Sequence, residues 1–313
     1  MSDQLKNGYD VVVAGGGAAG LNGALMLARS RRSVVVIDAG TPRNAPAAGV
    51  HGLLGNEGTP PTELLQRGHA EVRGYDGQIV TGEVAAVAQS GVGFEVALAD
   101  RRTVRARRLL VATGLTDELP DIPGLSDRWG RDVVHCPYCH GWEVRDQAIG
   151  VLATGPLSVH QALLFRQLSD DVTFFPCDRP LADDEAEQLA ARTISVIDGN
   201  VASIEIAGDR LVGVRMSDGT LVGREVVAVS PRMTARAGFL GGLGLKPAEH
   251  PAGVGEYIPA DPMGRTDMPG VWVAGNVTDL TAHVAGAAAA GALAGAQINA
   301  DLVAEDTRQA IRR

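Results

Sequence analysis

Two kinds of hydrophobic pattern alternate along the chain. Short continuous runs rich in Val, Ile, Leu and Phe predict strands that are buried on both faces. Segments with apolar residues at helical spacing follow several of them, directly after residue 20, at 157–168 and at 281–300. The pattern therefore predicts an α/β protein whose sheets are mainly parallel. The predicted strands are residues 9–14, 34–37, 109–112, 148–154, 172–175, 194–197, 202–207, 211–216, 226–229 and 271–274.

Proline-rich breaks in this pattern predict two domains. The segment DELPDIPG at 117–124 carries two closely spaced prolines, and a second break falls near residues 231–234. A single hydrophobic core rarely grows beyond about 250–300 residues, whereas this chain has 313. We therefore predict a discontinuous first domain, formed by 1–117 and 233–313, and a second domain formed by 118–232.

Composition and charge exclude several classes of protein. With 45% hydrophobic and 21% charged residues, the chain has the composition of a globular protein rather than a disordered one. The net charge of −9 disfavours nucleic acid as a partner, because phosphate binding needs a basic surface. The most apolar helical stretch, 285–296, is too short to span a membrane. The N-terminal MSDQLKNGYD lacks the apolar segment of a secretory signal, so we expect a cytoplasmic protein.

The turn after the first predicted strand carries the motif GGGAAG. Gly15, Gly17 and Gly20 form the pattern G-x-G-x-x-G between a strand and a helix, and Asp38 ends the next strand. In this pattern the first glycine permits a tight turn, the second lets a pyrophosphate approach the backbone, and the third allows close helix packing. The helix N-terminus stabilises phosphate charge, and the acid accepts hydrogen bonds from a ribose. The pattern predicts a dinucleotide site, with a purely structural glycine turn as the alternative.

The second motif, C-x-x-C, is formed by Cys136 and Cys139 and is followed at once by His140. Two thiols at this spacing can form a small disulfide ring, and their surroundings can lower the pKa of one thiol. The neighbouring imidazole can exchange protons near neutral pH. A zinc site that adds His135, His140 or Cys177 has poor ligand spacing, so we expect no metal. A buried structural pair of cysteines is the remaining alternative to redox chemistry.

Two further segments resemble the pyridine nucleotide–disulfide oxidoreductases. LLVATG at 109–114 resembles a turn of that family, and MPGVWVAGNVTD at 268–279 resembles its second flavin fingerprint, A-x-G-D, with Asn276 at the position of the Asp. The amide oxygen of Asn276 can still accept a hydrogen bond from a ribityl hydroxyl. The order of the motifs resembles low-molecular-weight thioredoxin reductase over nearly the whole chain. The form CPYCHGWE, with His140 where those reductases usually have Asp, resembles the thioredoxin reductase-like dithiol oxidases that close the disulfides of gliotoxin and holomycin.

This resemblance implies a fold, a cofactor and an activity. The fold is two Rossmann-like nucleotide-binding domains of three-layer ββα type, with FAD in the first domain and the C-x-x-C in the second. The activity is FAD-dependent oxidation of a small-molecule dithiol to an intramolecular disulfide, with electrons passed to O2 to give H2O2, by a homodimer. In such a family member Cys136 and Cys139 exchange with substrate, the latter nearer the flavin, and His140 is the acid and base. The residues that the resemblance assigns to FAD are Gly15, Gly17, Ala18, Ala19, Gly20, Asp38, Ala39, Arg43, Asn44, Ala112, Thr113, Gly114, Gly275, Asn276, His283 and Val284.

The second nucleotide motif departs from the reductase pattern. The family's G-x-G-x-x-A turn is here ATGPLS, in which Ala153 replaces the first glycine and Pro156 removes a backbone N–H. The basic cluster after the next strand becomes PCDR, in which Asp178 would repel an adenosine 2′-phosphate and Arg179 alone is a poor replacement. These residues argue against NADPH and, less strongly, against NADH. The open alternatives are an NAD(P)H-dependent thioredoxin-disulfide reductase, a cycle driven by a protein electron donor, and a redox-sensing flavoprotein without turnover.

Overall fold

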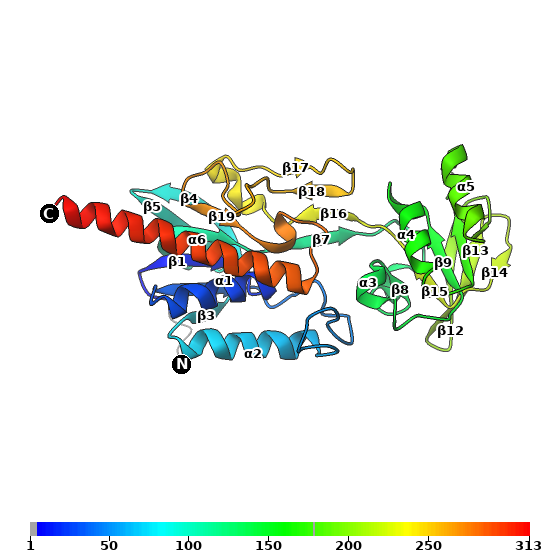
Figure 1. Ribbon diagram of the computed structural model, residues 1–313, viewed down its shortest axis with the longest axis horizontal. Helices are drawn as coiled ribbons and strands as arrows, with labels where there is room; N and C mark the ends of the chain where they lie inside the picture. The colour runs from blue at the N-terminus through cyan, green and yellow to red at the C-terminus, as the bar shows by residue number, and fades with distance from the viewer. Residues whose placement is uncertain (1–4, 178) are drawn as a thin grey trace.

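The computed structural model describes residues 5–177 and 179–313 as two α/β bodies joined by a pair of extended strands (Figure 1). The first body contains both ends of the described chain, and the second is formed by its middle part. Asp178, which was predicted to repel a 2′-phosphate, lies outside the described residues. So do the first four residues of the N-terminal segment that was compared with a secretory signal. Among the residues described, no helix is long and apolar enough to cross a membrane.

The first body is built on a seven-stranded sheet. Its order is β3-β2-β1-β6-β5-β4, with β19 also paired to β6. The pairings among β1, β2, β3, β6 and β19 are parallel, whereas β4, β5 and β6 form an antiparallel meander. The strands are β1 (Gly8–Ala14), β2 (Val34–Asp38), β3 (Gln78–Thr81), β4 (Val84–Ser90), β5 (Gly93–Leu98), β6 (Thr103–Val111) and β19 (Val271–Val273).

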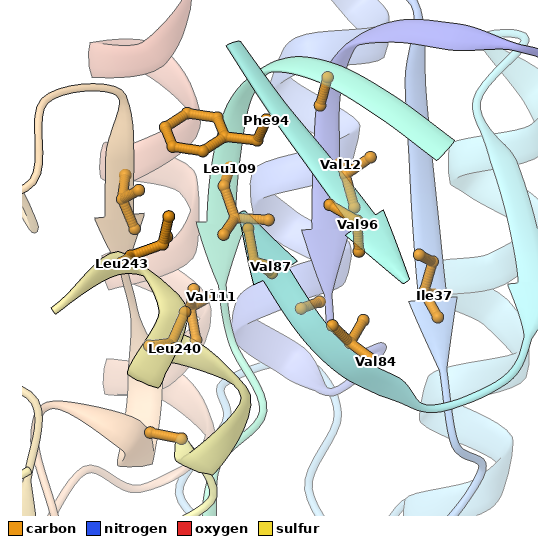
Figure 2. Packing of buried hydrophobic residues seen from close by; sticks show 14 of the residues in the cluster. Val12, Ile37, Val84, Val87, Phe94, Val96, Leu109, Val111, Leu240 and Leu243 are labelled. Atoms are coloured by element: carbon orange, nitrogen blue, oxygen red, sulfur yellow. The ribbon is translucent and has the colours of Figure 1, made fainter. Parts of the chain in front are cut away.

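Two hydrophobic cores lie on opposite faces of the parallel strands. Val11 and Val13 of β1 pack with α1 and α6, whereas Val12 and Ala14 pack with the meander and the 3₁₀ helix η2. Figure 2 shows the core on the side of the meander, where side chains of β4, β5 and η2 meet those of β1, β2 and β6. Three layers result, because successive residues of a strand point to opposite faces. The helices of this body are α1 (Ala18–Arg29), α2 (Pro61–Gly74), α6 (Val284–Ile311), η2 (Gly238–Leu243) and η3 (Gly275–Val277).

The two connections between the bodies form one antiparallel ribbon. In it β7 (Leu115–Glu118) pairs with β16 (Arg232–Ala235), and the small sheet has the order β17-β18-β16-β7. The domain boundaries predicted at 117/118 and 232/233 fall inside this ribbon. We propose the ribbon as the junction of two domains. The other strands of the sheet are β17 (Ala248–Glu249) and β18 (Gly255–Tyr257).

The second body repeats the α/β plan on a smaller scale. A parallel sheet of order β11-β10-β9-β15-β8 is accompanied by an antiparallel sheet of order β12-β13-β14. Every residue of β9, β10 and β15 is buried, as their continuous apolar runs predict. The strands are β8 (Val133–Val134), β9 (Ile149–Leu152), β10 (Val172–Phe175), β11 (Ser195–Val196), β12 (Val201–Ala207), β13 (Arg210–Met216), β14 (Leu221–Val222) and β15 (Val226–Ala228). The helices are η1 (Ser126–Arg128), α3 (Pro137–His140), α4 (Ser158–Phe165) and α5 (Asp183–Ala191).

Each predicted strand overlaps a strand of the structure, and the main differences are the bounds of α6 and several elements that were not predicted, among them the buried two-residue strand β8. Helix α6, predicted at 281–300, begins at Val284 and continues to Ile311. Its later turns are anchored by ion pairs from Arg108, on β6, to Asp301 and Glu305, which a hydrophobic pattern does not reveal. Helix α2 and the strands β4 and β5 lie outside the predicted elements, because exposed residues interrupt their apolar positions.

Helices α1 and α6 cross at glycines. A Cβ on Gly291 would lie 1.9 Å from the carbonyl oxygen of Ala19, and a Cβ on Gly295 would lie 2.6 Å from that of Gly23. Both distances are far below van der Waals contact, so the two helices approach this closely only because the residues are glycine. The crossing fixes the relative position of two candidate site segments, because α1 follows the G-x-G-x-x-G turn and α6 follows His283.

Gly291→Ala is expected to lower the free energy of unfolding by about 1–3 kcal/mol, because overpacking forces the helices apart. Gly286→Ala is the matched control in the same helix, since its Cβ would meet only the Cβ of Ala282, at 3.9 Å. Helix propensity alone favours alanine there by up to about 1 kcal/mol. Urea unfolding midpoints compare the two variants. Equal midpoints would show that the crossing does not constrain the fold.

Candidate active site

The glycine turn between β1 and α1 has two closed positions and one open position. Gly15 has a φ of +102°, and a Cβ there would lie 2.4 Å from the carbonyl oxygen of Ala112. A Cβ on Gly20 would lie 1.9 Å from the carbonyl oxygen of Gly15, so this glycine permits close packing of the helix. A Cβ on Gly17 would meet no atom within 4 Å. The backbone at Gly17 therefore faces open space, through which a phosphate can approach the first N–H groups of α1.

Asp38 ends β2 beside this turn. Its Oδ1 accepts hydrogen bonds from the backbone N–H groups of Gly16, at 3.3 Å, and Gly40, at 3.1 Å. Its Oδ2 lies 3.7 Å from Nε2 of His69, a residue of α2 that the sequence patterns did not single out. Burial lowers the pKa of His69, so its imidazole is neutral at pH 7. Oδ1 of Asp38 thus holds the glycine turn through hydrogen bonds, and Oδ2 faces His69 of α2.

A cleft of about 1390 Å³ is lined both by this turn and by the cysteines of the second body. Every residue predicted to bind FAD lines the cleft except Gly20, which is buried beneath the turn. The cleft offers backbone N–H groups for a diphosphate, the carboxylate of Asp38 for a ribose, and a dithiol pair. These are the groups that FAD needs in a thiol-oxidising enzyme, so the residues present fit this cofactor.

Arg43 lines the cleft with its guanidinium already paired. Nε and Nη2 donate to the two carboxylate oxygens of Asp117, at 2.7 and 2.6 Å. Asp117 lies on β7, and its side chain is only 7% exposed. The ion pair therefore ties the loop after β2 to the ribbon between the bodies. Asp117 is a cleft residue that sequence reasoning missed, because its partner lies 74 positions away and no local motif marks it.

Cys136 precedes α3 and Cys139 lies within it, and both are half-buried in the cleft. Their Sγ atoms are 2.9 Å apart, and the Cys139 thiol donates a hydrogen bond to the Cys136 sulfur. The spacing produces this contact because residues three apart lie on the same side of a helical turn. Sγ of Cys136 also lies 3.6 Å from Nε2 of His283, which precedes α6 in the first body. The contact between Cys136 and His283 thus joins the two bodies.

The surroundings of the two thiols shift their pKa values in opposite directions. The hydrogen bond from Cys139 outweighs burial and, with the charge of His283, lowers the pKa of Cys136 to about 5. Because Cys139 donates that hydrogen bond and is also buried, its pKa lies well above the usual range of a thiol. The reduced pair therefore holds one proton near neutral pH, with Cys136 as the thiolate.

His140 directly follows Cys139 in the chain. The imidazole that contacts a thiol of the pair in the described residues is nevertheless that of His283, beside Cys136. Burial lowers the pKa of His140, opposed by the charge of nearby Glu143. The same Glu143 has Oε1 3.4 Å from Nε2 of His51, which belongs to the loop after β2. The role of His140 as acid and base stays a prediction. His283 was predicted to assist at the flavin, and its contact with a redox sulfur is additional.

Asn276 holds the loop that presents His283. Its Nδ2 donates to the carbonyl oxygens of Asp279, Leu280 and Ala282, at 3.0, 3.3 and 2.9 Å. A carboxylate has no hydrogen to donate, so this loop favours Asn at a position where the family fingerprint has Asp. Because the amide nitrogen faces the loop, the amide oxygen is the atom that can serve a ligand in the cleft.

The turn after β9, which corresponds to the second nucleotide motif, uses its own groups as hydrogen-bond partners. The N–H of Thr154 donates to the carbonyl oxygen of Leu152, at 2.8 Å. The N–H of Gly155 donates to Oγ of the fully buried Ser158, at 3.1 Å. Pro156 has no N–H. A phosphate could use these donors only if the turn first broke its own hydrogen bonds.

The cation next to the predicted 2′-phosphate position is also engaged. Nη2 of Arg179 donates to Oε1 of Glu185, in the first turn of α5, at 3.0 Å. The repulsion predicted from Asp178 lies outside the described residues. Among the groups that are described, the second body therefore offers this phosphate an arginine that already has a carboxylate partner.

The fold and these groups define a class of protein. Residues 9–292 match the model of the pyridine nucleotide-disulphide oxidoreductase family, and the chain belongs to this family. It is therefore an oxidoreductase enzyme, with the predicted fold of two Rossmann-like domains, and both predictions are confirmed.

Individual relatives support the narrower resemblance to thioredoxin reductase-like proteins. Thioredoxin reductase tcpT of Claviceps purpurea (strain 20.1) is 32% identical over 312 residues, which are 96% of this chain and 96% of tcpT. The crystal structure of HlmI is similar with a TM-score of 0.93 and 46% identity, over 99% of this chain and 97% of HlmI. An oxidoreductase from Agrobacterium tumefaciens is similar with a TM-score of 0.87 and 35% identity, over 94% of this chain and 98% of the other.

The thiolate of Cys136 should give its alkylation a distinctive pH dependence. In the reduced protein we expect its reaction with iodoacetamide to have a midpoint near pH 5, set by a pKa of about 5, because only the thiolate reacts. Cys139→Ala removes the hydrogen bond to Cys136, which lowers the pKa of Cys136 more than the charge of His283 does. This variant should therefore raise the pH midpoint of alkylation more than His283→Ala does. Mass spectrometry of the labelled peptide measures the rates. A wild-type midpoint in the range of an ordinary thiol, or the reverse order of the variants, would contradict this account.

Asn276→Asp is expected to lower the free energy of unfolding by about 1–3 kcal/mol, because it removes the donor shared by three carbonyls. Asn200→Asp makes the same exchange at an exposed position and is the control. The loosened loop should also move the Cys136 alkylation midpoint upward. Thermal unfolding and the alkylation assay measure the two effects. Equal stability of the two variants would show that Asn276 does not hold the loop.

Proposed function

We propose that this enzyme oxidises a small-molecule dithiol to an intramolecular disulfide through Cys136 and Cys139, with FAD as cofactor and O2 as electron acceptor. The observation that carries the proposal is the second nucleotide turn, where Gly155 donates to Ser158 rather than facing a ligand. A flavoenzyme whose nicotinamide turn is filled by its own side chains needs another electron donor. A dithiol can supply electrons directly to the paired cysteines in the cleft.

The proposed FAD site extends along the cleft of the first body. The N–H groups at the start of α1, beyond Gly17, would hold the diphosphate, and Asp38 would accept from the adenosine ribose. The amide oxygen of Asn276 would accept from the ribityl chain. When bound, FAD would supply two-electron redox chemistry: an acceptor for the electron pair of the reduced cysteines, whose disulfide would be restored, and a donor of that pair to O2 to give H2O2.

The proposed thiol–disulfide exchange has two steps. A substrate thiolate attacks Sγ of Cys136 in the Cys136–Cys139 disulfide, the disulfide bond breaks, and Cys139 leaves with the electron pair. The second substrate thiolate then attacks the substrate sulfur of the mixed disulfide, which closes the product disulfide and releases Cys136. The low pKa of Cys136 makes it a good leaving group in this second step. Two electrons have then moved from the substrate to the cysteine pair.

The substrate also loses two protons in this exchange. The Cys139 thiol keeps one, which forms the hydrogen bond to Cys136. We propose His283 as the acceptor of the other, because its Nε2 lies 3.6 Å from the Cys136 sulfur and the imidazolium would stabilise the thiolate. His140, with a pKa lowered by burial, remains the predicted acid and base for the leaving Cys139.

The rival function is an NAD(P)H-dependent thioredoxin-disulfide reductase, the activity after which tcpT is named. The internally bonded turn at Gly155 weighs against it, as does the ion pair of Arg179 with Glu185. Homodimer assembly, a cytoplasmic location and a part in the biosynthesis of disulfide-containing natural products complete the proposal. The homodimer and the biosynthetic part rest on the resemblance drawn from the sequence motifs, and the cytoplasmic location stays an expectation from the sequence.

Anaerobic mixing of the FAD-loaded enzyme with a small dithiol is expected to bleach the flavin, whereas NADPH and NADH leave it oxidised. Cys136→Ser should slow the bleaching at least about a thousandfold, as removal of an active-site nucleophile does. Cys177→Ser is the control, because Cys177 is partly buried against the core of the second body and does not line the cleft. Stopped-flow absorbance measures the rates, and admitting air should return the flavin colour with formation of H2O2. Rapid bleaching by NADPH would replace this proposal with the reductase.

A further inference from the structure

Three metal-ligating atoms converge at the redox pair. Sγ of Cys136, Sγ of Cys139 and a ring nitrogen of His283 all lie within 4.8 Å of one another. The sequence motif alone predicts no metal site, because a C-x-x-C followed by His140 lacks a suitably spaced third ligand. The third ligand instead comes from the other body, 147 positions from Cys136.

The separations suit tetrahedral coordination. With Zn–S bonds of about 2.3 Å and Zn–N bonds of about 2.0–2.1 Å, tetrahedral geometry separates S from N by about 3.6 Å and S from S by about 3.8 Å. The observed distance from Cys136 Sγ to His283 Nε2 is 3.6 Å. The two sulfurs, 2.9 Å apart, would need to separate by roughly 1 Å through rotation of their side chains. A fourth position remains open to the cleft for water or a substrate thiolate.

We propose that the reduced Cys136–Cys139 pair and His283 bind one soft divalent cation of the zinc class, and that the bound cation arrests the enzyme. This inference rests on the proposed function only in its consequence, the arrest of dithiol oxidation. Binding displaces the proton of Cys139 and leaves both sulfurs as metal thiolates, so neither sulfur can re-form the disulfide until the metal leaves. The oxidised pair has no thiolate to offer, so the site exists only in the reduced enzyme.

The surrounding charges permit a cation. The charge of Arg43 acts on Cys139, but its guanidinium is neutralised by the bidentate pair with Asp117. His283 is exposed to the cleft, and an imidazole ring in its deprotonated form can turn a lone pair toward a metal. Thiolate and imidazole ligands select zinc-like cations over Mg²⁺, which prefers oxygen.

The test measures Zn²⁺ binding to the anaerobic, FAD-loaded enzyme by competition with a chromophoric chelator, in the reduced and the oxidised states. We expect one Zn²⁺ per reduced chain, at least about tenfold weaker binding in His283→Ala, and recovery in His283→Cys, which restores a ligand atom. His160→Ala is the matched control, because His160 is an exposed histidine of the same cleft. Mg²⁺ should not bind at this site.

Each outcome decides the inference. Wild-type affinity in His283→Ala, or equal Zn²⁺ binding by the oxidised enzyme, would overturn it. If His283→Ala does not fold, two measurements still test the metal site. These are Zn²⁺ binding by the reduced and the oxidised wild-type enzyme, and Zn²⁺ binding by the His283→Cys variant. Reduced-state Zn²⁺ binding in an enzyme whose flavin no dithiol bleaches would support the metal site and reject dithiol oxidation. Bleaching that bound Zn²⁺ does not inhibit would reject the arrest of the enzyme by the metal and leave dithiol oxidation standing.

Discussion

The contact between the Cys136 sulfur and the His283 imidazole is the interaction on which the rest of the site depends. It is made across the two bodies, so it requires the β7–β16 ribbon to hold them in register. It also requires the loop that Asn276 fastens, since that loop carries His283 to the start of α6. Through the glycine crossing of α1 and α6, His283 is also connected to the helix that begins at the G-x-G-x-x-G turn. The cysteine pair and the proposed cofactor site thus share one packed support.

Much of the fold could be predicted from the sequence because the buried strands are continuous apolar runs. The run at 172–175 is predicted to the residue, and β1, β2 and β9 differ by only a few positions at their ends. Elements stabilised by distant partners could not be predicted in this way. The last turns of α6 are rich in polar residues, and Arg108 of β6 anchors them through ion pairs with Asp301 and Glu305.

The same division applies to the site. Local motifs were sufficient to predict that Gly15, Gly17 and the cysteine pair lie at the cleft, because their geometry depends on backbone shape and spacing within one turn. They were not sufficient for Asp117, whose partner Arg43 lies in another segment, or for the pairing of His283 with a thiol. The first contact joins segments 74 positions apart, and the second depends on how the two bodies are oriented. No periodicity along the chain encodes either of them.

The self-bonded turn after β9 has an evolutionary consequence. Replacing Pro156 alone would restore one donor, yet Gly155 would still donate to Ser158 and Arg179 would still be held by Glu185. Removing Ser158 alone would leave a void in a fully buried position and no second donor. Opening this turn to a phosphate therefore takes several exchanges together, at Pro156, at Ser158 and at the Arg179–Glu185 pair. A loss of nicotinamide binding that is built in this manner would be hard to reverse by single substitutions.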